Sequence, residues 1–278
     1  MKELLNFSLI NIDKPAGPTS YSVSEFVKWQ LKLKKTSHMG TLDPKVTGVL
    51  PITLGRACKL ADYFIKHDKS YVGILHTHSA QDIKKLQKLI DENFTGKIKQ
   101  TPPNRSAVKV QERERTVYHW TLTEASEDGR DFLFDCRVEG GTYIRKLCSD
   151  LGEMIGGAHM GELRRTAAGI FDEATSVNLN DFEEAVEDYK NGNEKPLRTM
   201  LMPAEDAIKK VLPFVSVEKR VLRALYNGKP LFKKDVIGKI TKFKDGDHFS
   251  AFCGDVFVGI YRKTKERGIL GRAEFVKN

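Results

Sequence analysis

The chain has 278 residues with a formal net charge of +9, and its composition is 40% hydrophobic and 30% charged. These proportions exclude a disordered or fibrous protein, and no apolar run approaches the ~18 residues that a membrane-spanning helix needs. The length allows one large domain, or one large domain with a small one.

The expected helices and strands follow one another in an irregular order. Apolar residues at helical spacing predict helices at 22–31, 53–66, 80–94, 144–155, 181–190 and 204–211, the first behind a capping box of Ser22 and Glu25. Alternating runs predict strands at 70–79 and 131–138, and at 236–243, 249–253 and 256–261 in a β-rich tail. This mixture favours an α+β or mixed α/β sheet over a doubly wound parallel one.

The cysteines and the amino terminus bear on the compartment. Cys58, Cys136, Cys148 and Cys253 lie far apart without a Cys-x-x-Cys pair, which favours reduced thiols over a disulfide framework or a zinc site. The first residues lack the apolar stretch and the small-residue cleavage site of a signal peptide. We therefore expect a cytoplasmic protein.

The positive charge is concentrated in the tail. Residues 213–278 hold 15 Lys and Arg and 7 Asp and Glu, a net +8, whereas residues 1–212 hold 31 and 30, a net +1. A basic terminal module suggests a polyanionic partner such as nucleic acid. A lysine-rich solvated surface is an equally good explanation from charge alone.

One carboxylate stands in an unusual loop at 37–48. Asp43 lies between Gly40 and Gly48 and precedes Pro44, which keeps the aspartate out of the α region. The side chain would project from a constrained turn. From spacing alone, an aspartate that only forms the turn is the better interpretation.

An arginine follows two glycines at an expected strand-to-helix transition. Gly140 and Gly141 let the backbone turn sharply, and Arg145 follows at the start of the helix. An arginine there could pair with a buried carboxylate or a phosphate. An exposed first-turn arginine is the simpler alternative.

Three further features are weaker candidates. Tyr71 follows a basic cluster and could stack on a base, although a strand tyrosine is more often core. The proline-fixed loop at 102–109 carries basic residues that suit phosphate contact or plain solvation. His76 and His78 would share a strand face, but the sequence offers no third metal ligand. Phosphate-loop, dinucleotide and serine-hydrolase motifs are absent from the sequence.

The order and combination of seven short blocks are more specific than any one of them. The blocks are IDKPAGPTS at 12–20, HMGTLDP at 38–44, TGVLP at 47–51, KSY at 69–71, PNRSAVK at 103–109, GTYIR at 141–145 and AHMGELRR at 158–165. Together they closely resemble the TruB/dyskerin family of RNA pseudouridine synthases. The resemblance is dense over residues 8–170 and thin beyond them.

The resemblance implies a fold and a set of site residues. The fold would be α+β, with a mixed, largely antiparallel central sheet in a catalytic domain at 1–212 and a reduced PUA-like RNA-binding domain at 213–278. Asp43 would be the nucleophile, Arg145 its ion-pair partner and Tyr71 the side chain that stacks on uracil. The positions that would line or support the substrate cleft are His38, Lys14, Lys109, Leu163 and Tyr143. The family needs no metal and no cofactor.

Within this family the chain looks archaeal or dyskerin-like. Only 34 residues separate Tyr71 from Ser106 (106 − 71 − 1), so the long insertion of bacterial TruB enzymes is absent. The branch usually works in the H/ACA guide-RNA particle, with guide RNA, rRNA and small accessory proteins, and in archaea also acts alone on tRNA. The first motif begins about ten residues in and the chain stops at Asn278, and these short ends favour the T-loop uridine 55 of tRNA as substrate.

Two alternatives remain open beside that expectation. The chain could be the catalytic subunit of a guide-RNA particle that modifies rRNA, or an RNA-binding scaffold of that particle without activity of its own. The presence of Asp43, Tyr71 and Arg145 favours an enzyme, because a scaffold has no need of the three together.

Overall fold

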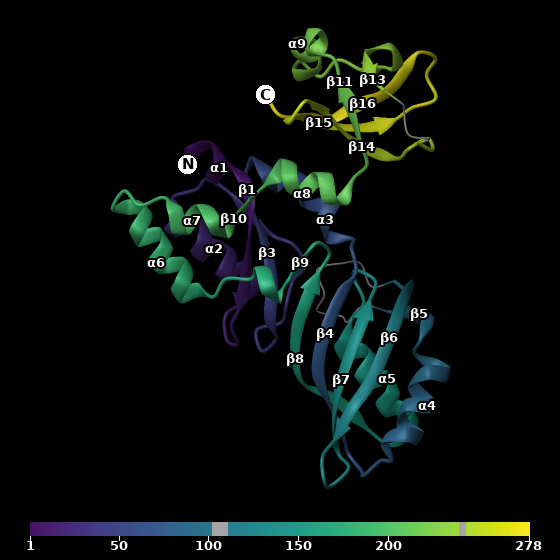
Figure 1. Ribbon diagram of the computed structural model, residues 1–278. Helices are drawn as coiled ribbons and strands as arrows, with labels where there is room; N and C mark the ends of the chain where they lie inside the picture. The colour runs from purple at the N-terminus through teal and green to yellow at the C-terminus, as the bar shows by residue number, and fades with distance from the viewer. Residues whose placement is uncertain (102–110, 239–242) are drawn as a thin grey trace. The chain divides into compact units, whose positions relative to one another are not determined.

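A computed structural model describes residues 1–101, 111–238 and 243–278 (Figure 1). The chain divides into two units, Met1–Leu201 and Met202–Asn278. This division lies ahead of the boundary that the charge distribution suggests after Leu212, and helix α8 (Ala204–Val211) accordingly counts with the second unit.

The first unit is built on one twisted sheet whose path runs β1-β3-β8-β4-β7-β6-β5. These strands are β1 Phe7–Lys14, β3 Thr47–Gly55, β8 Ala158–Ala168, β4 Lys69–Thr77, β7 Asp131–Val138, β6 Arg113–Ala125 and β5 Gly96–Gln100. The short strands β2 (Thr36–His38) and β9 (Phe171–Asp172) pair with β3 and β8. Within the described residues, the ladders between these strands are antiparallel except for the short β3–β8 contact. The expected mixed, largely antiparallel α+β sheet is confirmed.

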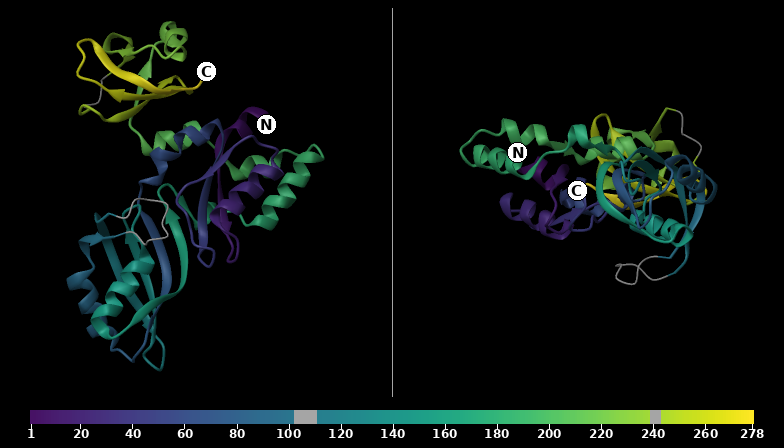
Figure 2. Two further views of the ribbon diagram at one scale, coloured as in Figure 1. Left: turned by 180° about the vertical axis from the view of Figure 1, so that it is seen from behind. Right: turned by 90° about the horizontal axis from the view of Figure 1, so that it is seen from below.

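Helices α4 (Ile83–Asn93) and α5 (Ile144–Ile155) cover one face of strands β4, β7 and β6 (Figure 2). The residues of β4 alternate between buried and partly exposed along its whole length, so this strand has one face that needs to be covered. Beneath the helices, Trp120 packs edge-on against Phe94 and Phe134, with ring centroids 5.9 Å apart in each pair. This core fixes the strands from which the site residues project.

Helices also pack beside β1 and β3. These are α1 (Lys2–Asn6), α2 (Ser20–Gln30), α6 (Leu179–Lys190) and α7 (Lys195–Met200). Phe26 of α2 meets Phe182 of α6 edge-on at 6.3 Å. Helix α2 begins at Ser20, two residues earlier than the sequence suggests, because its capping box joins Thr19 and Ser22 and does not use Glu25.

The helix expected at 53–66 is replaced by three shorter elements. Residues up to Gly55 belong to β3, the 3₁₀ helix η1 covers Arg56–Leu60, and α3 covers Ala61–Ile65. The apolar spacing that suggested one helix comes from two consecutive short ones. Its first residues pair with β1 instead, since Thr53 lies opposite Leu9 in an antiparallel ladder.

The second unit contains a small sheet in the order β12-β16-β15-β14-β11-β13. The strands are β11 Phe214–Val217, β12 Leu231–Phe232, β13 Val236–Ile237, β14 His248–Cys253, β15 Val256–Lys263 and β16 Ile269–Val276, with the helix α9 at Leu222–Tyr226. Phe249 stacks on Tyr261 in its core, with centroids 5.9 Å apart. The β-rich tail is thus confirmed, although the strand expected at 236–243 runs partly outside the described residues. No helix among the described residues is long and apolar enough to cross a membrane.

Candidate active site

The loop that carries Asp43 connects β2 to β3 and is anchored by main-chain contacts. Met39 N donates to Pro51 O at 2.8 Å, and Gly17 N donates to Pro44 O at 2.9 Å. The buried Ser20 hydroxyl accepts from Leu42 N at 2.8 Å. None of these bonds uses the Asp43 side chain, so the loop conformation does not depend on that carboxylate.

Arg145 reaches Asp43 from the start of helix α5. The distance from Nη2 of Arg145 to Oδ2 of Asp43 is 2.6 Å, and the two side chains are 60% and 47% exposed. Tyr143 is the residue before the helix, and the side-chain amide of Gln100 bonds its N–H at 3.1 Å and its carbonyl at 3.3 Å. The helix start is therefore fixed, and the ion pair stands open to a ligand.

A second arginine, Arg165 on β8, anchors both ends of the same loop. It is 1% exposed, and its guanidinium donates to Val49 O at 2.7 Å and to Gly40 O at 2.9 Å. The glycines leave it room: a Cβ on Gly40 would lie 3.2 Å from the guanidinium, and one on Gly48 would lie 2.2 Å from the Arg165 carbonyl oxygen. The two glycines around Asp43 thus serve this close approach.

Tyr71 lies opposite Arg165 in the β4–β8 ladder and hydrogen-bonds its guanidinium. The phenol is 7% exposed, and burial raises its pKa, while Arg165 works in the opposite direction. The phenol is therefore protonated at neutral pH. Arg165 connects Tyr71 to the loop of Asp43, a link that the sequence reasoning did not assign. Its sequence signals are its place at the end of the block AHMGELRR and the alternation that turns Leu163 and Arg165 inward together.

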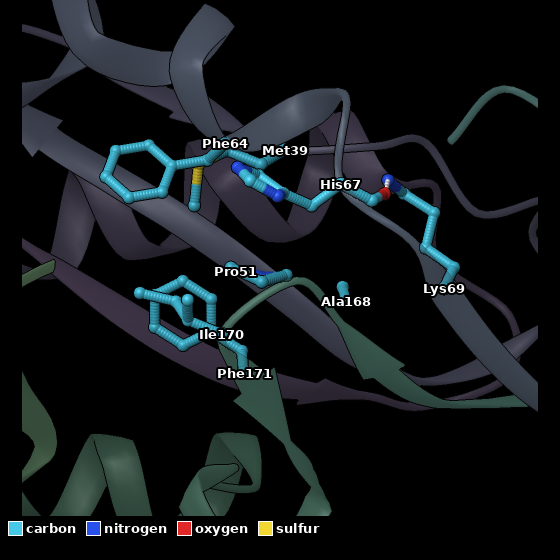
Figure 3. Close-up of a pocket in the computed structure, with 8 residues that line it drawn as sticks. All are labelled: Met39, Pro51, Phe64, His67, Lys69, Ala168, Ile170 and Phe171. Carbon is cyan, nitrogen blue, oxygen red and sulfur yellow. Dashed lines mark hydrogen bonds between the residues drawn. The ribbon is translucent and has the colours of Figure 1, made fainter. Parts of the chain in front are cut away.

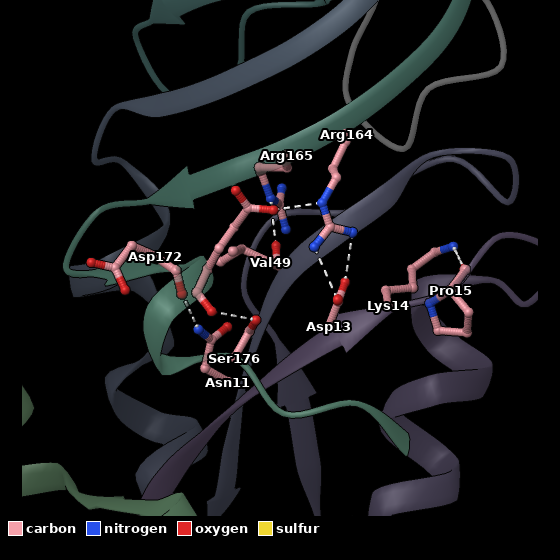
Figure 4. A network of polar contacts seen from close by, with 10 residues as sticks. Asn11, Asp13, Lys14, Pro15, Val49, Arg164, Arg165, Asp172 and Ser176 are labelled. Atoms are coloured by element: carbon pink, nitrogen blue, oxygen red, sulfur yellow. Dashed lines mark hydrogen bonds and ion pairs between the residues drawn. The ribbon is translucent and has the colours of Figure 1, made fainter. Parts of the chain in front are cut away.

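The neighbouring Arg164 faces the other side of β8. It forms two parallel bonds of 2.9 Å to the carboxylate of Asp13 (Figure 4). Its Nε lies 2.5 Å from Oε1 of Glu173. These ion pairs raise the pKa of Arg164. Arg164 connects β8 to β1, and this joins two strands that flank β3.

Lys14 and His38 lie around the loop. The Lys14 ammonium is buried and donates to Pro15 O at 2.7 Å and to Pro44 O at 3.0 Å. Burial lowers its pKa, and the charge of Asp43 partly opposes this. His38 ends β2, where Nε2 lies 3.2 Å from the Thr41 hydroxyl, and burial followed by the charge of Arg165 lowers its pKa.

The structure places the other residues expected in the cleft in different surroundings. Leu163 on β8 is 7% exposed and belongs to the core of the first unit. Tyr143 is partly buried at the start of α5, two residues before Arg145. Lys109 and the rest of the loop at 102–109 lie outside the described residues.

A small cavity of about 10 Å³ lies beside Met39 and is no larger than about one water molecule. Its lining residues are Met39, Pro51, Phe64, His67, Lys69, Ala168, Ile170 and Phe171 (Figure 3). It cannot hold a base. The buried Lys69 ammonium donates to Ile65 O at 2.7 Å and to His67 O at 2.5 Å, and burial lowers its pKa to about 8.

Lys69 should make stability depend on pH in the alkaline range. Between the folded pKa of about 8 and the unfolded value of ~10.4, the unfolded chain holds a proton that the folded chain has lost. The free energy of unfolding contributed by Lys69 therefore rises with pH across this window, by at most ~1.4 kcal/mol per unit, and is level below it. Urea denaturation of the wild type and Lys69→Met at pH 7 to 10 measures this, and parallel pH profiles for the two proteins would refute it.

Comparisons with known proteins give the same picture. The model of the N-terminal domain of TruB family pseudouridylate synthases matches residues 28–144, and that of the tRNA pseudouridylate synthase B C-terminal domain matches residues 145–209. A probable tRNA pseudouridine synthase B of Methanopyrus kandleri is 42% identical over 97% of the chain and 82% of its own length. Another, of Pyrobaculum aerophilum, is 39% identical over 99% and 85%.

Solved structures agree along the whole chain. The chain is similar to one in a Cbf5-Nop10-Gar1 complex, with a TM-score of 0.90 and 36% identity over 99% of this chain and 86% of that one. It is also similar to one in an H/ACA particle bound to a substrate RNA, with a TM-score of 0.88 and 34% identity over the same shares.

The fold and these similarities define a pseudouridine synthase, an isomerase that acts on uridine in RNA. The chain belongs to the TruB family, in its archaeal, dyskerin-like branch.

Proposed function

We propose that this synthase converts the T-loop uridine 55 of tRNA to pseudouridine, with Asp43 as its nucleophile. The observation that carries the proposal is the open ion pair in which Arg145 holds Asp43 at 2.6 Å. Relatives along nearly the whole chain are named as probable tRNA pseudouridine synthases. The reaction needs neither oxidant nor water, so a carboxylate held by a guanidinium is chemically sufficient as the attacking group.

The proposed reaction begins with extrusion of the uridine from its stack, which costs a few kcal/mol. Asp43 attacks the nucleotide, the bond from C1′ to N1 breaks, and the base turns until C5 bonds to C1′. The bond to Asp43 then breaks, the proton on C5 leaves, and N1, freed from the sugar, takes up a proton, so the product is an isomer of the substrate. Arg145 keeps the carboxylate oriented and offsets its charge while the nucleotide enters.

Tyr71 is proposed to contact the uracil ring. Only 7% of the side chain is exposed, so stacking requires its neighbours to withdraw when RNA binds. Its protonated phenol and its bond to Arg165 keep the ring at a fixed place beside the Asp43 loop. His38, Lys14, Leu163 and Tyr143 are proposed to line or support this cleft, and Lys109 to contact the RNA.

The second unit is proposed to be a reduced PUA-like domain that holds RNA through its positive charge. Residues 213–278 carry a net +8 (15 − 7), and such charge attracts RNA over long range. We also place the protein in the cytoplasm, where its four free cysteines would stay reduced.

Guide-directed modification of rRNA is the second candidate function. It is favoured by the similarity to chains solved in complexes with Nop10, Gar1 and substrate RNA. In that case H/ACA guide RNA and the small accessory proteins would be partners. A purely RNA-binding scaffold is the least favoured role, because the ion pair of Asp43 and Arg145 is in place.

One experiment separates these functions. The purified chain is incubated with an unmodified tRNA transcript in the absence of guide RNA, and pseudouridine is mapped along the tRNA, with Asp43→Asn as the blank. We expect product at the T-loop uridine. Product that forms only after guide RNA and accessory proteins are added would instead support guide-directed modification. Absence of product under both conditions would favour the role of an RNA-binding scaffold.

Arg145→Lys should lower the rate of modification by about 10²-fold, because a point charge cannot hold a carboxylate in one orientation as a planar guanidinium does. Single-turnover rates on tRNA measure the loss. The control is Lys146→Arg on the same helix, whose side chain pairs with Asp150 and should tolerate the change. Equal rates for both variants would disprove the orienting role.

A further inference from the structure

Three histidines meet on the sheet face opposite to helices α4 and α5. His76 alternates with the buried Leu75 and Thr77 on β4, so it points away from the core. In the ladder, His76 lies directly opposite His159 of β8 on one side and opposite Asp131 of β7 on the other. His78 is the residue after β4; its N–H bonds Gly157 O at 2.9 Å, and its ring lies beside those of His76 and His159.

The spacing of the rings suits one metal ion. The ring centroids of His76 and His159 are 4.9 Å apart, those of His78 and His159 are 5.6 Å apart, and those of His76 and His78 are 6.4 Å apart. With a zinc–nitrogen distance of ~2 Å and tetrahedral angles, the centroids of three imidazole ligands lie about 5 Å apart. Two of the three separations are close to that value.

A carboxylate already orients one of the rings. Nδ1 of His76 lies 2.7 Å from Oδ1 of Asp131, an arrangement that leaves Nε2 with the free lone pair. Histidines that bind metals almost always make such a bond through the other ring nitrogen. The ring of His78 lies over Gly157 and has room there because glycine lacks a Cβ, which would come within 2.2 Å of Nδ1.

The rings are near to, but not in, the arrangement of an occupied site. Among the described residues, no group of three His, Cys, Asp or Glu side chains is placed to hold a metal ion as it stands. His78 and His159 are exposed, so rotation of their side chains costs little and can shorten the 6.4 Å separation. A divalent ion could then bind the three imidazole rings together, because the backbone already places them close to one another.

We propose that His76, His78 and His159 form a binding site for a late first-row divalent metal ion, with Zn²⁺ as its typical occupant and water as the fourth ligand. The sequence alone offers two histidines and no third ligand, and the cross-strand register supplies His159. The site is built from the outer face of β4 and β8 and uses none of the residues proposed for the isomerisation. It therefore stands independently of the substrate proposed above.

Calorimetric titration of the full-length, chelator-treated protein with Zn²⁺ tests the proposal. We expect one ion per chain in the wild type, and loss of binding by at least about tenfold in His159→Gln and in His78→Gln. Asp131→Asn should weaken binding by about 10- to 100-fold without abolishing it, because an amide oxygen orients the His76 ring less strongly than a charged carboxylate does. Thermal unfolding of each variant without zinc shows that the fold is retained.

The matched control is His119→Gln. His119 also pairs with a strand aspartate, Asp135, but lies on β6 away from the cluster, so zinc binding should be unchanged. Absence of zinc binding in the wild type would overturn the proposal. So would binding that survives His159→Gln and His78→Gln, or that His119→Gln abolishes.

Discussion

Asp43→Asn should abolish pseudouridine formation and leave the fold intact. The amide matches the carboxylate in shape but is a far weaker nucleophile, and removal of a nucleophile costs at least about 10³-fold in rate. The loop should keep its conformation because its anchors at Gly40, Leu42 and Val49 are main-chain groups. The lost ion pair is half exposed, and such pairs contribute only ~0–1 kcal/mol to stability.

Three measurements on Asp43→Asn separate chemistry from structure. Single-turnover assays on tRNA should show no product, while thermal unfolding and tRNA affinity should match the wild type. The matched variant is Asp13→Asn, which removes the structural ion pair between β1 and Arg164 of β8 and should retain turnover. Product formation by Asp43→Asn would exclude Asp43 as the nucleophile.

Arg165→Met should reduce both stability and activity. The substitution leaves the carbonyl oxygens of Gly40 and Val49 without their buried donor and removes the bond to Tyr71. An unsatisfied buried polar group costs ~1–3 kcal/mol, so a total loss of about 3 kcal/mol or more is expected. Both ends of the loop would be released, and misplacement of the carboxylate by about 1 Å can cost 10²-fold in rate.

The appropriate control for Arg165→Met is Arg164→Met, one residue away on the opposite face. Arg164 is partly exposed and binds Asp13 and Glu173 instead of the loop. Urea denaturation measures stability, and rates are compared at a temperature at which both variants are folded. If folded Arg165→Met is as active as Arg164→Met, Arg165 supports only the fold and does not position the loop.

The fold class could be predicted from the sequence, but the local boundaries depended on tertiary pairing. The alternation over 70–79 predicts β4 correctly because one of its faces is fully buried. The helix expected at 53–66 was wrong at its start, because Thr53 pairs with β1 and tertiary pairing outweighs helical spacing. The capping box lies at Thr19 and Ser22 because the Thr19 hydroxyl accepts from Ser22 N, three residues before the cap expected at Ser22.

The sequence motifs predicted some residues of the site but not the contacts between them. The resemblance indicates Asp43 and Arg145, and the structure places them in contact although 101 residues separate them in sequence (145 − 43 − 1). No spacing rule reveals that Arg165 reaches Gly40 and Val49, or that His159 lies opposite His76. Both depend on the register of β8, which is set by the packing of the whole sheet.

The short parallel contact between β3 and β8 has a consequence for the order of folding. It joins a sheet made by the first 55 residues to one made largely between residues 69 and 138, and it consists of Thr47 opposite Arg164 and Gly48 opposite Arg165. During synthesis, more than a hundred residues must therefore be added after the loop of Asp43 before Arg165, which anchors that loop, is made. Such long-range closure slows folding, so competence for catalysis should be acquired late, after the helices and hairpins have formed.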